Sequence, residues 1–419
     1  MDRRHFMKHL AAASAGGLFS SHVPRLCAWA QEGEARPQFF MFIFAAGGWD
    51  PTMVFEIKAG LQNIDVDPAG DSAEAGGIQF FHNAARPWVQ TFFQDFGNMS
   101  CVINGVNTMT VSHEVGEEIM LTGDAGVPRP DWPTIVASEN GEGLPVPNMA
   151  LSGPSYAGNL GQGTASGSGF LTLLLNSGSF SPANATAELV IDAYRERRFE
   201  NLMNRLVAEG RTGSRMGDLK ASNDSYNELK DLRSDLGDEF LDLDGLAGEG
   251  IALATAFQRG FAITGSIYAP GQWDSHSNNY GAQNQNFDNT FRDLHSIVTH
   301  LSNQPATAGA GSLIDQTTLI VMSEFGRTPK LNSVQGKDHW PITTVLAIGA
   351  NVRGSTTLGG TDDYQNSVEV DFATGLPLVG GSEIGSQNLG SAFLQLAGID
   401  PDLFLPSAIV PFDAFLRQT

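Results

Sequence analysis

Five carboxylate and imidazole side chains of this sequence have the residue types and settings of metal ligands. They are, in chain order, Asp50, Asp274, His276, Glu324 and His339. Carboxylate oxygens and imidazole nitrogens are the ligands that hard and borderline divalent cations take in proteins. We therefore expect these residues to hold divalent ions such as Zn, Mn, Mg or Ca. A carboxylate that follows a strand is often a cap or turn residue instead, and that alternative stays open for Asp50 and Glu324.

A second kind of chemistry is suggested by Ser112 and His113, which open a predicted helix. A hydroxyl at a helix N-terminus is well placed to attack phosphorus or sulfur, because the free N–H groups there stabilise an anion. Ser112 as a plain N-cap is the alternative. Arg327, Lys330 and Lys337 are candidates to bind a substrate oxyanion in a chain that is otherwise acidic.

Buried strands are predicted to position these side chains. Continuous apolar runs predict strands at 38–44, 317–322 and 343–348, with shorter ones at 100–103 and 147–151. Such runs are typical of a parallel sheet covered on both faces by helices. Helices are predicted at 112–121, 185–208, 248–262, 287–301 and from 391, and 214–236 reads as a charged surface excursion. This alternation favours a doubly wound α/β fold.

Ligands of such sheets bind beyond the carboxyl ends of the strands, where the candidate residues fall. Asp50 and Glu324 each come within six residues of the end of a predicted strand. The segment 273–276 is expected in a loop between two helices, and 337–341 precedes a strand. We treat residues 31–419 as one large domain with a helical insertion around 185–265.

The first 30 residues have the features of a twin-arginine signal peptide. Arg3 and Arg4 precede a short, weakly apolar stretch, and an A-x-A sequence at 28–30 gives a cleavage site before Gln31. The stretch is too short to span a membrane, which takes about 20 apolar residues. The sequence therefore predicts export by the twin-arginine translocase to the periplasm or beyond, without a membrane span in the mature protein.

Charge and cysteine content narrow the range of functions. The formal net charge of −22 argues against a nucleic-acid partner, because phosphate backbones are bound by Lys and Arg. Of the two cysteines, Cys27 falls within the signal peptide. Cys101 is then alone in the mature chain, and its apolar surroundings predict a buried packing residue rather than a disulfide partner.

Four segments of the chain resemble the signature segments of the domain of unknown function 1501 family, whose members are exported bacterial proteins. They lie at 47–50 (GGWD), 273–276 (WDSH), 323–329 (SEFGRTP) and 338–341 (DHWP). The resemblance extends from about residue 38 to the C-terminus.

That family is similar to the alkaline phosphatase and sulfatase superfamily. The resemblance implies a three-layer α/β/α sandwich around a mainly parallel sheet, two metal positions and a Ser, Thr or modified Cys nucleophile. Ser112 is the nearest match to the nucleophile. Asp50 and Glu324 match the ligands of one ion. Asp274, His276 and His339 match the ligands of the other.

Two departures from the superfamily pattern stand out. Phe325 occupies a position where the pattern has a His ligand, and His113 is the candidate replacement. Cys101 lacks the Cys-x-Pro-x-Arg context of a formylglycine sulfatase.

Two hypotheses of different class follow. The first is an exported metal-dependent hydrolase of phosphate or sulfate esters, acting on a small-molecule or glycan substrate, with Ser112, His113 and Arg327 as catalytic residues. The second is a non-catalytic exported protein that keeps the fold and binds a metal or glycan.

Overall fold

The computed structural model describes residues 38–144, 146–160, 164–166, 197–208 and 245–417. The predicted signal peptide and the charged segment at 214–236 lie outside these ranges. The insertion predicted around 185–265 is described only at 197–208, which is helical, and from residue 245 onwards. None of the described helices is long and apolar enough to cross a membrane.

A mixed, mainly parallel sheet forms the centre of the described part of the chain. Its nine strands follow the order β12-β4-β11-β8-β1-β7-β5-β6, and β13 also pairs with β4. The strands are β1 (Phe39–Phe44), β4 (Ser100–Asn107), β5 (Asn148–Ala150), β6 (Thr164–Ser166), β7 (Thr264–Tyr268), β8 (Thr317–Met322), β11 (Ile342–Gly349), β12 (Thr356–Gly359) and β13 (Ile384–Gly385). Only β11 runs antiparallel to its neighbours β4 and β8. The expected α/β class with a mainly parallel sheet is confirmed.

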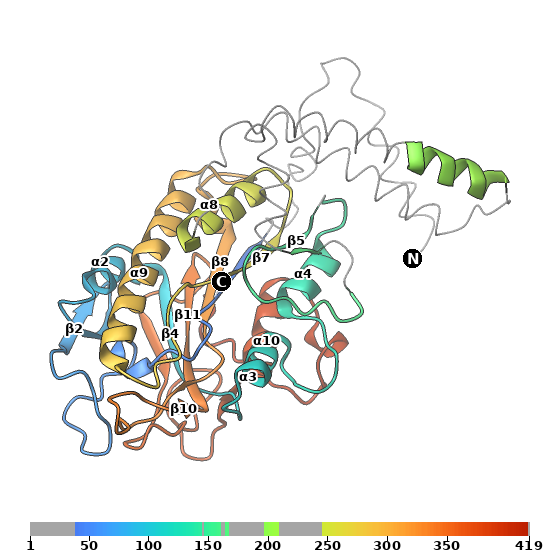
Figure 1. The fold of residues 1–419 in the computed structure, drawn as a ribbon. Helices are drawn as coiled ribbons and strands as arrows, with labels where there is room; N and C mark the ends of the chain where they lie inside the picture. The colour runs from blue at the N-terminus through green and yellow to red at the C-terminus, as the bar shows by residue number, and fades with distance from the viewer. Residues whose placement is uncertain (1–37, 145, 161–163, 167–196, 209–244, 418–419) are drawn as a thin grey trace.

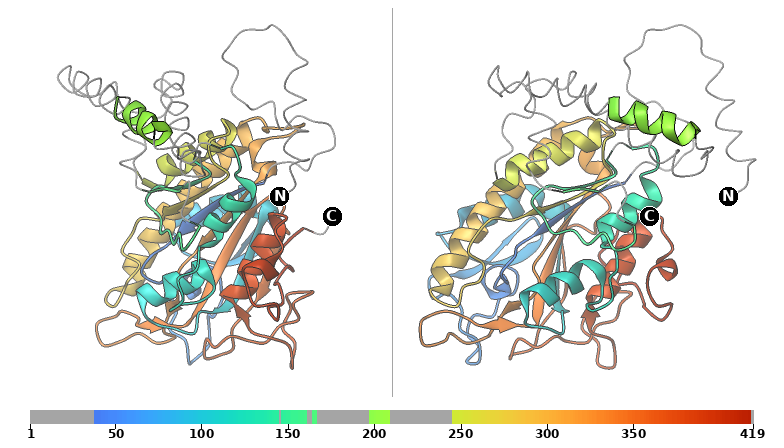
Figure 2. Two further views of the ribbon diagram at one scale, coloured as in Figure 1. Left: turned by 90° about the vertical axis from the view of Figure 1, so that its right-hand side faces the viewer. Right: turned by 45° about the vertical axis from the view of Figure 1, so that its right-hand side comes forward.

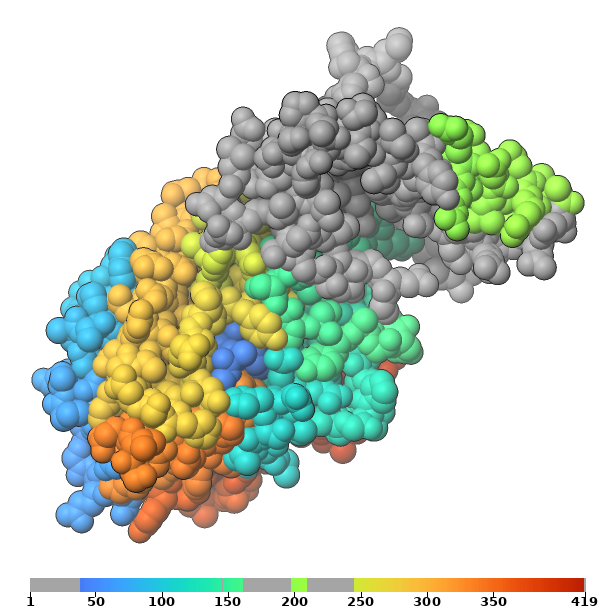
Figure 3. Space-filling model, in the orientation of Figure 1, coloured from blue at the N-terminus to red at the C-terminus, as the bar shows by residue number. Residues whose placement is uncertain are grey.

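Helices cover both faces of this sheet (Figures 1 and 2). One group is α2 (Pro87–Phe96), α8 (Gly245–Gln258) and α9 (Asn279–Asn303). The other group is α3 (His113–Thr122), α4 (Trp132–Asn140) and α10 (Ser386–Leu396). Figure 3 shows the yellow to gold segments of the first group beside the teal segments of α3 and α4 on one face of the molecule. The predicted three-layer arrangement is therefore observed.

The two faces of β1 explain why its sequence is a continuous apolar run. Met41 and Ile43 belong to the core cluster under α2, α8 and α9. Phe42 and Phe44 belong to the cluster under α3, α4 and α10. Because successive side chains of a strand point to opposite faces, a strand between two helical layers must be apolar throughout. Each fully buried Phe contributes about 1.5–3 kcal/mol of hydrophobic stabilisation.

Cys101 lies in β4 with no solvent exposure, as its apolar surroundings predicted. Burial raises the pKa of its thiol to about 12. The thiol therefore stays protonated at neutral pH and serves as a packing group.

The structure corrects the prediction around residues 260–290. Strand β7 lies between α8 and α9, so residues 273–276 follow a strand and are not in a loop between two helices. Its small residues escaped the apolar-run pattern, although Thr264 and Ser266 are buried. A Cβ atom at Gly265 would lie 2.5 Å from the side chain of Leu253 on α8 and 2.9 Å from the Met149 carbonyl oxygen, so the glycine allows α8 and β5 to pack closely here.

Two antiparallel hairpins complete the elements that matter for the site and its surroundings. One pairs β2 (Asp71–Ala75) with β3 (Ile78–His82), and the other pairs β9 (Gly326–Arg327) with β10 (His339–Trp340). A short 3-10 helix, η2 (Pro51–Met53), directly follows Asp50.

Candidate metal centre

The candidate residues meet at one edge of the sheet because of the strand directions. The parallel strands β1, β7 and β8 end there and deliver Asp50, Asp274 and Glu324. Strand β4 ends at the same edge and leads into α3, which begins at His113. Because β11 runs antiparallel, its N-terminal end lies at this edge too, and His339, three residues ahead of it in β10, joins the group.

Three imidazoles converge on the carboxylate of Asp274. The Nε2 atoms of His339 and His276 lie 3.0 and 3.1 Å from its Oδ1 atom. The Nε2 atom of His113 lies 3.5 Å from its Oδ2 atom. Ligand atoms of His113, Asp274 and His339 all fall within 4.8 Å of one another, so these three residues could hold one metal ion. We call His113, Asp274, His276 and His339 the metal cluster.

Each imidazole is oriented by a hydrogen-bond acceptor at its other ring nitrogen. The Nδ1 atom of His113 faces the Glu324 carboxylate at 2.7 Å, and that of His276 faces Asp338 at 2.8 Å. The Nδ1 atom of His339 faces the backbone carbonyl of Val111 at 2.7 Å. An acceptor at Nδ1 places the proton of a neutral imidazole there and leaves a lone pair at Nε2. Metal-binding histidines are held in this way.

The spacing of the Nε2 atoms fits a shared cation. Those of His276 and His339 are 2.9 Å apart, and the acceptors at both Nδ1 atoms direct two lone pairs toward each other. Two lone pairs at this distance repel unless a proton or a metal ion lies between them. Tetrahedral Zn with ligands at about 2.0–2.1 Å keeps neighbouring nitrogens roughly 3.3 Å apart. The 2.9 Å between the Nε2 atoms of His276 and His339 is within a few tenths of an ångström of that spacing.

Arg327 holds the loops that carry the cluster. Its guanidinium is fully buried and donates to the backbone carbonyls of Gly48, Lys337, Trp273 and Gly47. It also donates to Asp274 Oδ1 at 2.7 Å.

The pKa values of Asp274 and Arg327 reflect burial and the contact between the two side chains. Burial raises the pKa of Asp274, but the hydrogen bond and the positive charge of Arg327, together with the neighbouring His339 and His276, outweigh it and bring the value to about 2. The same carboxylate opposes the effect of burial on Arg327, whose pKa is lowered. Asp274 is therefore an anion at neutral pH, as a metal ligand must be. Arg327, which was expected to bind a substrate oxyanion, lies where it positions Asp274 and the surrounding backbone.

Glu324 lies behind His113, as the partner of its outer nitrogen. Its Oε1 atom accepts from the backbone N–H of Gly47 at 2.6 Å as well as from His113. Its Oε2 atom accepts from Ser323 Oγ at 2.9 Å. The hydrogen bond to Glu324 is the main cause of the raised pKa of His113. Glu324, expected as a direct ligand, is placed to orient one.

The structure does not bring Asp50 into the metal cluster. Its carboxylate is fully buried and pairs with the ammonium of Lys337 at 2.9 Å. It also accepts from Asn279 Nδ2 at 2.9 Å and Thr52 Oγ1 at 2.7 Å. A buried ammonium thus faces the carboxylate that the family resemblance assigned to a second ion. Two charges removed from water in this way satisfy each other and need no cation.

The first turns of α9 show why its start was predicted too late. The helix begins at Asn279 instead of near 287. Its early residues are polar and buried: Asn279 donates to Asp50, and Gln283 accepts from the Asp50 N–H and donates to the Trp273 carbonyl. A helical face that packs through hydrogen bonds carries no apolar periodicity, so sequence patterning misses it.

Ser112 is exposed and forms the N-cap of α3, with no side-chain capping hydrogen bond. Its hydroxyl is therefore not committed to capping, which was the alternative reading of this residue. It immediately precedes the cluster residue His113.

Phe325 packs against the imidazoles where the superfamily pattern has another ligand. Its ring centroid lies 4.4 Å from that of His339 and 4.9 Å from that of His113. The aromatic ring restricts the rotation of both imidazoles. His113 supplies a third imidazole from α3, and its role as a replacement ligand stays a prediction.

Comparison with known proteins gives a family for the C-terminal part of the chain. Residues 245–375 match the family described as "Protein of unknown function (DUF1501)". This part of the chain belongs to the DUF1501 family. The matched range contains three of the four residues of the metal cluster and both of its carboxylate supports, namely Asp274, His276, His339, Glu324 and Asp338.

Solved structures similar to the chain share little of its sequence. One is a protein in the alkaline phosphatase superfamily from Vibrio parahaemolyticus, with 11% identity, a TM-score of 0.39 and coverage of 97% of this chain and 80% of that chain. Another is a lipoteichoic acid synthase from Listeria monocytogenes, with 8% identity, a TM-score of 0.40 and coverage of 91% and 76%. The chain matches no curated protein sequence.

Proposed function

We propose that this protein is a metal-dependent hydrolase that acts on phosphate or sulfate esters. The observation that carries the proposal is the convergence of three imidazole Nε2 atoms on Asp274, each imidazole oriented by an acceptor at Nδ1. Building such a site in an acidic chain costs free energy unless a cation fills it, because lone pairs and a carboxylate face one another.

The ligand set favours a borderline metal ion over a hard one. Three imidazoles and one carboxylate suit Zn, and Mn less well, whereas Mg and Ca prefer all-oxygen sites. A divalent ion at this position would polarise an ester oxygen and increase the acidity of a coordinated water. A single ion is expected, because Lys337 already neutralises Asp50.

Residues of the chain itself would perform the remaining steps. The exposed hydroxyl of Ser112 is the candidate nucleophile, and the free N–H groups in the first turn of α3 would stabilise charge on the attacked group. Glu324 and Asp338 keep His113 and His276 oriented. Arg327 holds Asp274 in place.

Metal analysis and turnover of aryl esters test the proposal together. The purified protein should contain about one Zn or Mn per chain and hydrolyse 4-nitrophenyl phosphate or 4-nitrophenyl sulfate. The variant His339→Ala should lose both metal and activity. The variant His295→Ala is the matched control, because this α9 histidine pairs with Asp95 and belongs to no part of the cluster.

The outcomes separate the two hypotheses drawn from the sequence. A protein that binds no metal, even after incubation with added ions, would refute the hydrolase proposal. Metal binding without turnover of either ester would favour the non-catalytic alternative.

We also propose that the mature protein starts at Gln31 and is exported through the twin-arginine translocase. The support is the order of the arginine pair, the apolar stretch and the A-x-A sequence in the first 30 residues. Replacing Arg3 and Arg4 by Lys should leave the precursor in the cytoplasm. Unchanged processing, measured by fractionation and N-terminal sequencing, would contradict this.

A further inference from the structure

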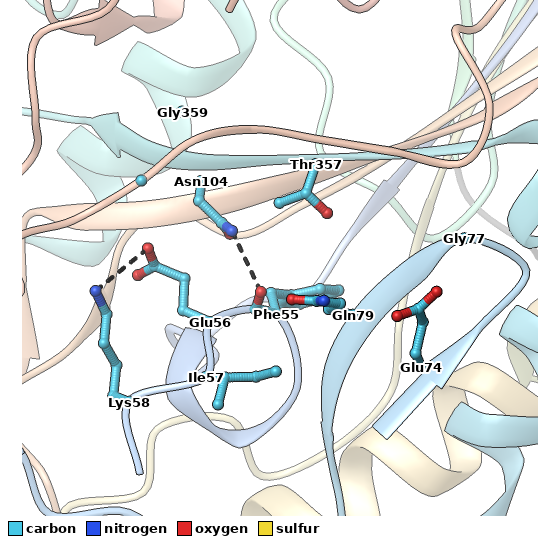
Figure 4. Close-up of a pocket in the computed structure, with 11 residues that line it drawn as sticks. Phe55, Glu56, Ile57, Lys58, Glu74, Gly77, Gln79, Asn104, Thr357 and Gly359 are labelled. Carbon is cyan, nitrogen blue, oxygen red and sulfur yellow. Dashed lines mark hydrogen bonds and ion pairs between the residues drawn. The ribbon is translucent and has the colours of Figure 1, made fainter. Parts of the chain in front are cut away.

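A cavity of about 440 Å³ lies at the β12 edge of the sheet and shares no residue with the metal cluster. It is bounded by the loop after η2, the β2–β3 hairpin, β4 and β12. Figure 4 shows its lining, in which the principal polar side chains are Glu56, Lys58, Glu74, Gln79, Asn104 and Thr357. Its volume falls within the range of roughly 300–1,000 Å³ that is usual for small-molecule sites.

Three polar side chains of this cavity have no partner within the described part of the chain. Glu74, Gln79 and Thr357 are exposed, and none of the three side chains hydrogen-bonds to another described residue. Glu74 and Gln79 are directly opposite each other in the β2–β3 register. Side chains in this relation project from the same face of the hairpin. A carboxylate, an amide and a hydroxyl therefore remain available to a ligand.

The other end of the cavity is fixed by internal hydrogen bonds. The buried carboxylate of Glu56 accepts from the backbone N–H of Thr361 at 2.8 Å and from its hydroxyl at 2.7 Å. The ammonium of Lys58 lies 3.7 Å from Glu56 and donates to the Thr361 carbonyl at 2.7 Å. Asn104 donates to the Phe55 carbonyl at 3.2 Å. Groups held in this way need little reordering when a ligand binds.

The charges of the lining select the class of ligand. Glu56 and Glu74 outnumber Lys58, so an anion would meet net repulsion. A metal ion or an amine would find only the Glu74 carboxylate free, because Glu56 already accepts twice from Thr361 and lies 3.7 Å from the Lys58 ammonium. Carboxylate and amide oxygens in excess favour a neutral ligand with many hydroxyl donors. Ile57 adds apolar surface for the C–H groups of such a ligand.

We propose that this cavity binds a neutral, hydroxyl-rich ligand, with a saccharide unit as the fitting class. Gln79 and Glu74 contact its hydroxyl groups from the hairpin, and Thr357 does so from β12. The proposal stands on the cavity alone and does not depend on hydrolase activity at the metal cluster.

A glycan array and calorimetry test the assignment. The labelled mature protein is screened against neutral, amino, sulfated and phosphorylated glycans, and the best soluble ligand is then titrated into the unlabelled protein. Gln79→Ala and Thr357→Val should each weaken binding by about tenfold, the size expected for one or two lost hydrogen bonds. Gln395→Ala, an exposed glutamine on α10, is the control and should bind like the parent.

The binding results either support or overturn the proposed saccharide site. Neutral glycan binding that falls in both cavity variants, and persists in His339→Ala, would support the site. The inference would be overturned by an array without neutral ligands or by affinity unchanged in both cavity variants. Binding that disappears in His339→Ala would also overturn it, because the glycan would then occupy the metal cluster.

Discussion

Replacing Glu324 by Gln isolates the electrostatic support that a buried carboxylate gives to a metal-binding imidazole. Glu324 is 2% exposed and receives hydrogen bonds from Gly47, His113 and Ser323. A Gln side chain has the same shape. Its carbonyl can still accept from Gly47 and His113, and its amide can donate to Ser323. The variant therefore removes the negative charge while it keeps the hydrogen bonds.

The expected effect follows from the role of partners behind metal ligands. Loss of such a partner weakens metal affinity by about 10–100-fold. Because Glu324→Gln keeps the hydrogen bonds, we expect the lower end, about tenfold or 1.4 kcal/mol. Glu324→Ala should approach 100-fold, since His113 loses its acceptor. It should also lower the free energy of unfolding by about 1–3 kcal/mol, because the Gly47 N–H is left unsatisfied.

Calorimetric titration of Zn into metal-free protein measures these differences, and urea unfolding measures stability. Glu142→Gln is the control, since Glu142 is exposed and lies away from the cluster in the chain. Equal Zn affinity in the parent, Glu324→Gln and Glu324→Ala would refute the reasoning, even if the Ala variant were less stable. In that case Glu324 would support the fold and not the metal.

Two further predictions concern the packing around the cluster. Lys337→Ala should lower the free energy of unfolding by about 3–5 kcal/mol, because Asp50 would keep a buried, unpaired charge. Lys330 is half-exposed, so Lys330→Ala should lower the free energy of unfolding by less than about 1 kcal/mol. Similar losses for Lys337→Ala and Lys330→Ala in urea titrations would contradict this. Gly116→Ala should weaken Zn affinity, because the new Cβ atom would lie 2.9 Å from the Glu324 carbonyl oxygen and push α3 away from Glu324. This is expected even though Ala favours a helix over Gly by about 1 kcal/mol. Unchanged affinity in calorimetry would show that α3 tolerates the displacement.

Much of the fold could be predicted from local sequence. The apolar runs at β1 and β8 needed no tertiary information, because a strand between two helical layers is apolar on both sides. The same reasoning failed for β7 and for the first turns of α9. Small residues line β7 where α8 packs closely, and hydrogen-bonded amides line α9 where it borders Asp50. Both are buried surfaces without the hydrophobic signal on which sequence patterns depend.

For the candidate site, too, the sequence predicted some features and the tertiary structure decided others. The residue types and their places near strand ends predicted a metal centre, since these are local properties of the chain. Which side chains meet was decided by the order and direction of the strands. Strand order brings Lys337 to Asp50 and Glu324 to His113, and the antiparallel direction of β11 carries His339 to the same edge. Residues so distant along the chain come into contact only when the sheet forms, because hydrogen bonds and ion pairs act over a few ångströms of space.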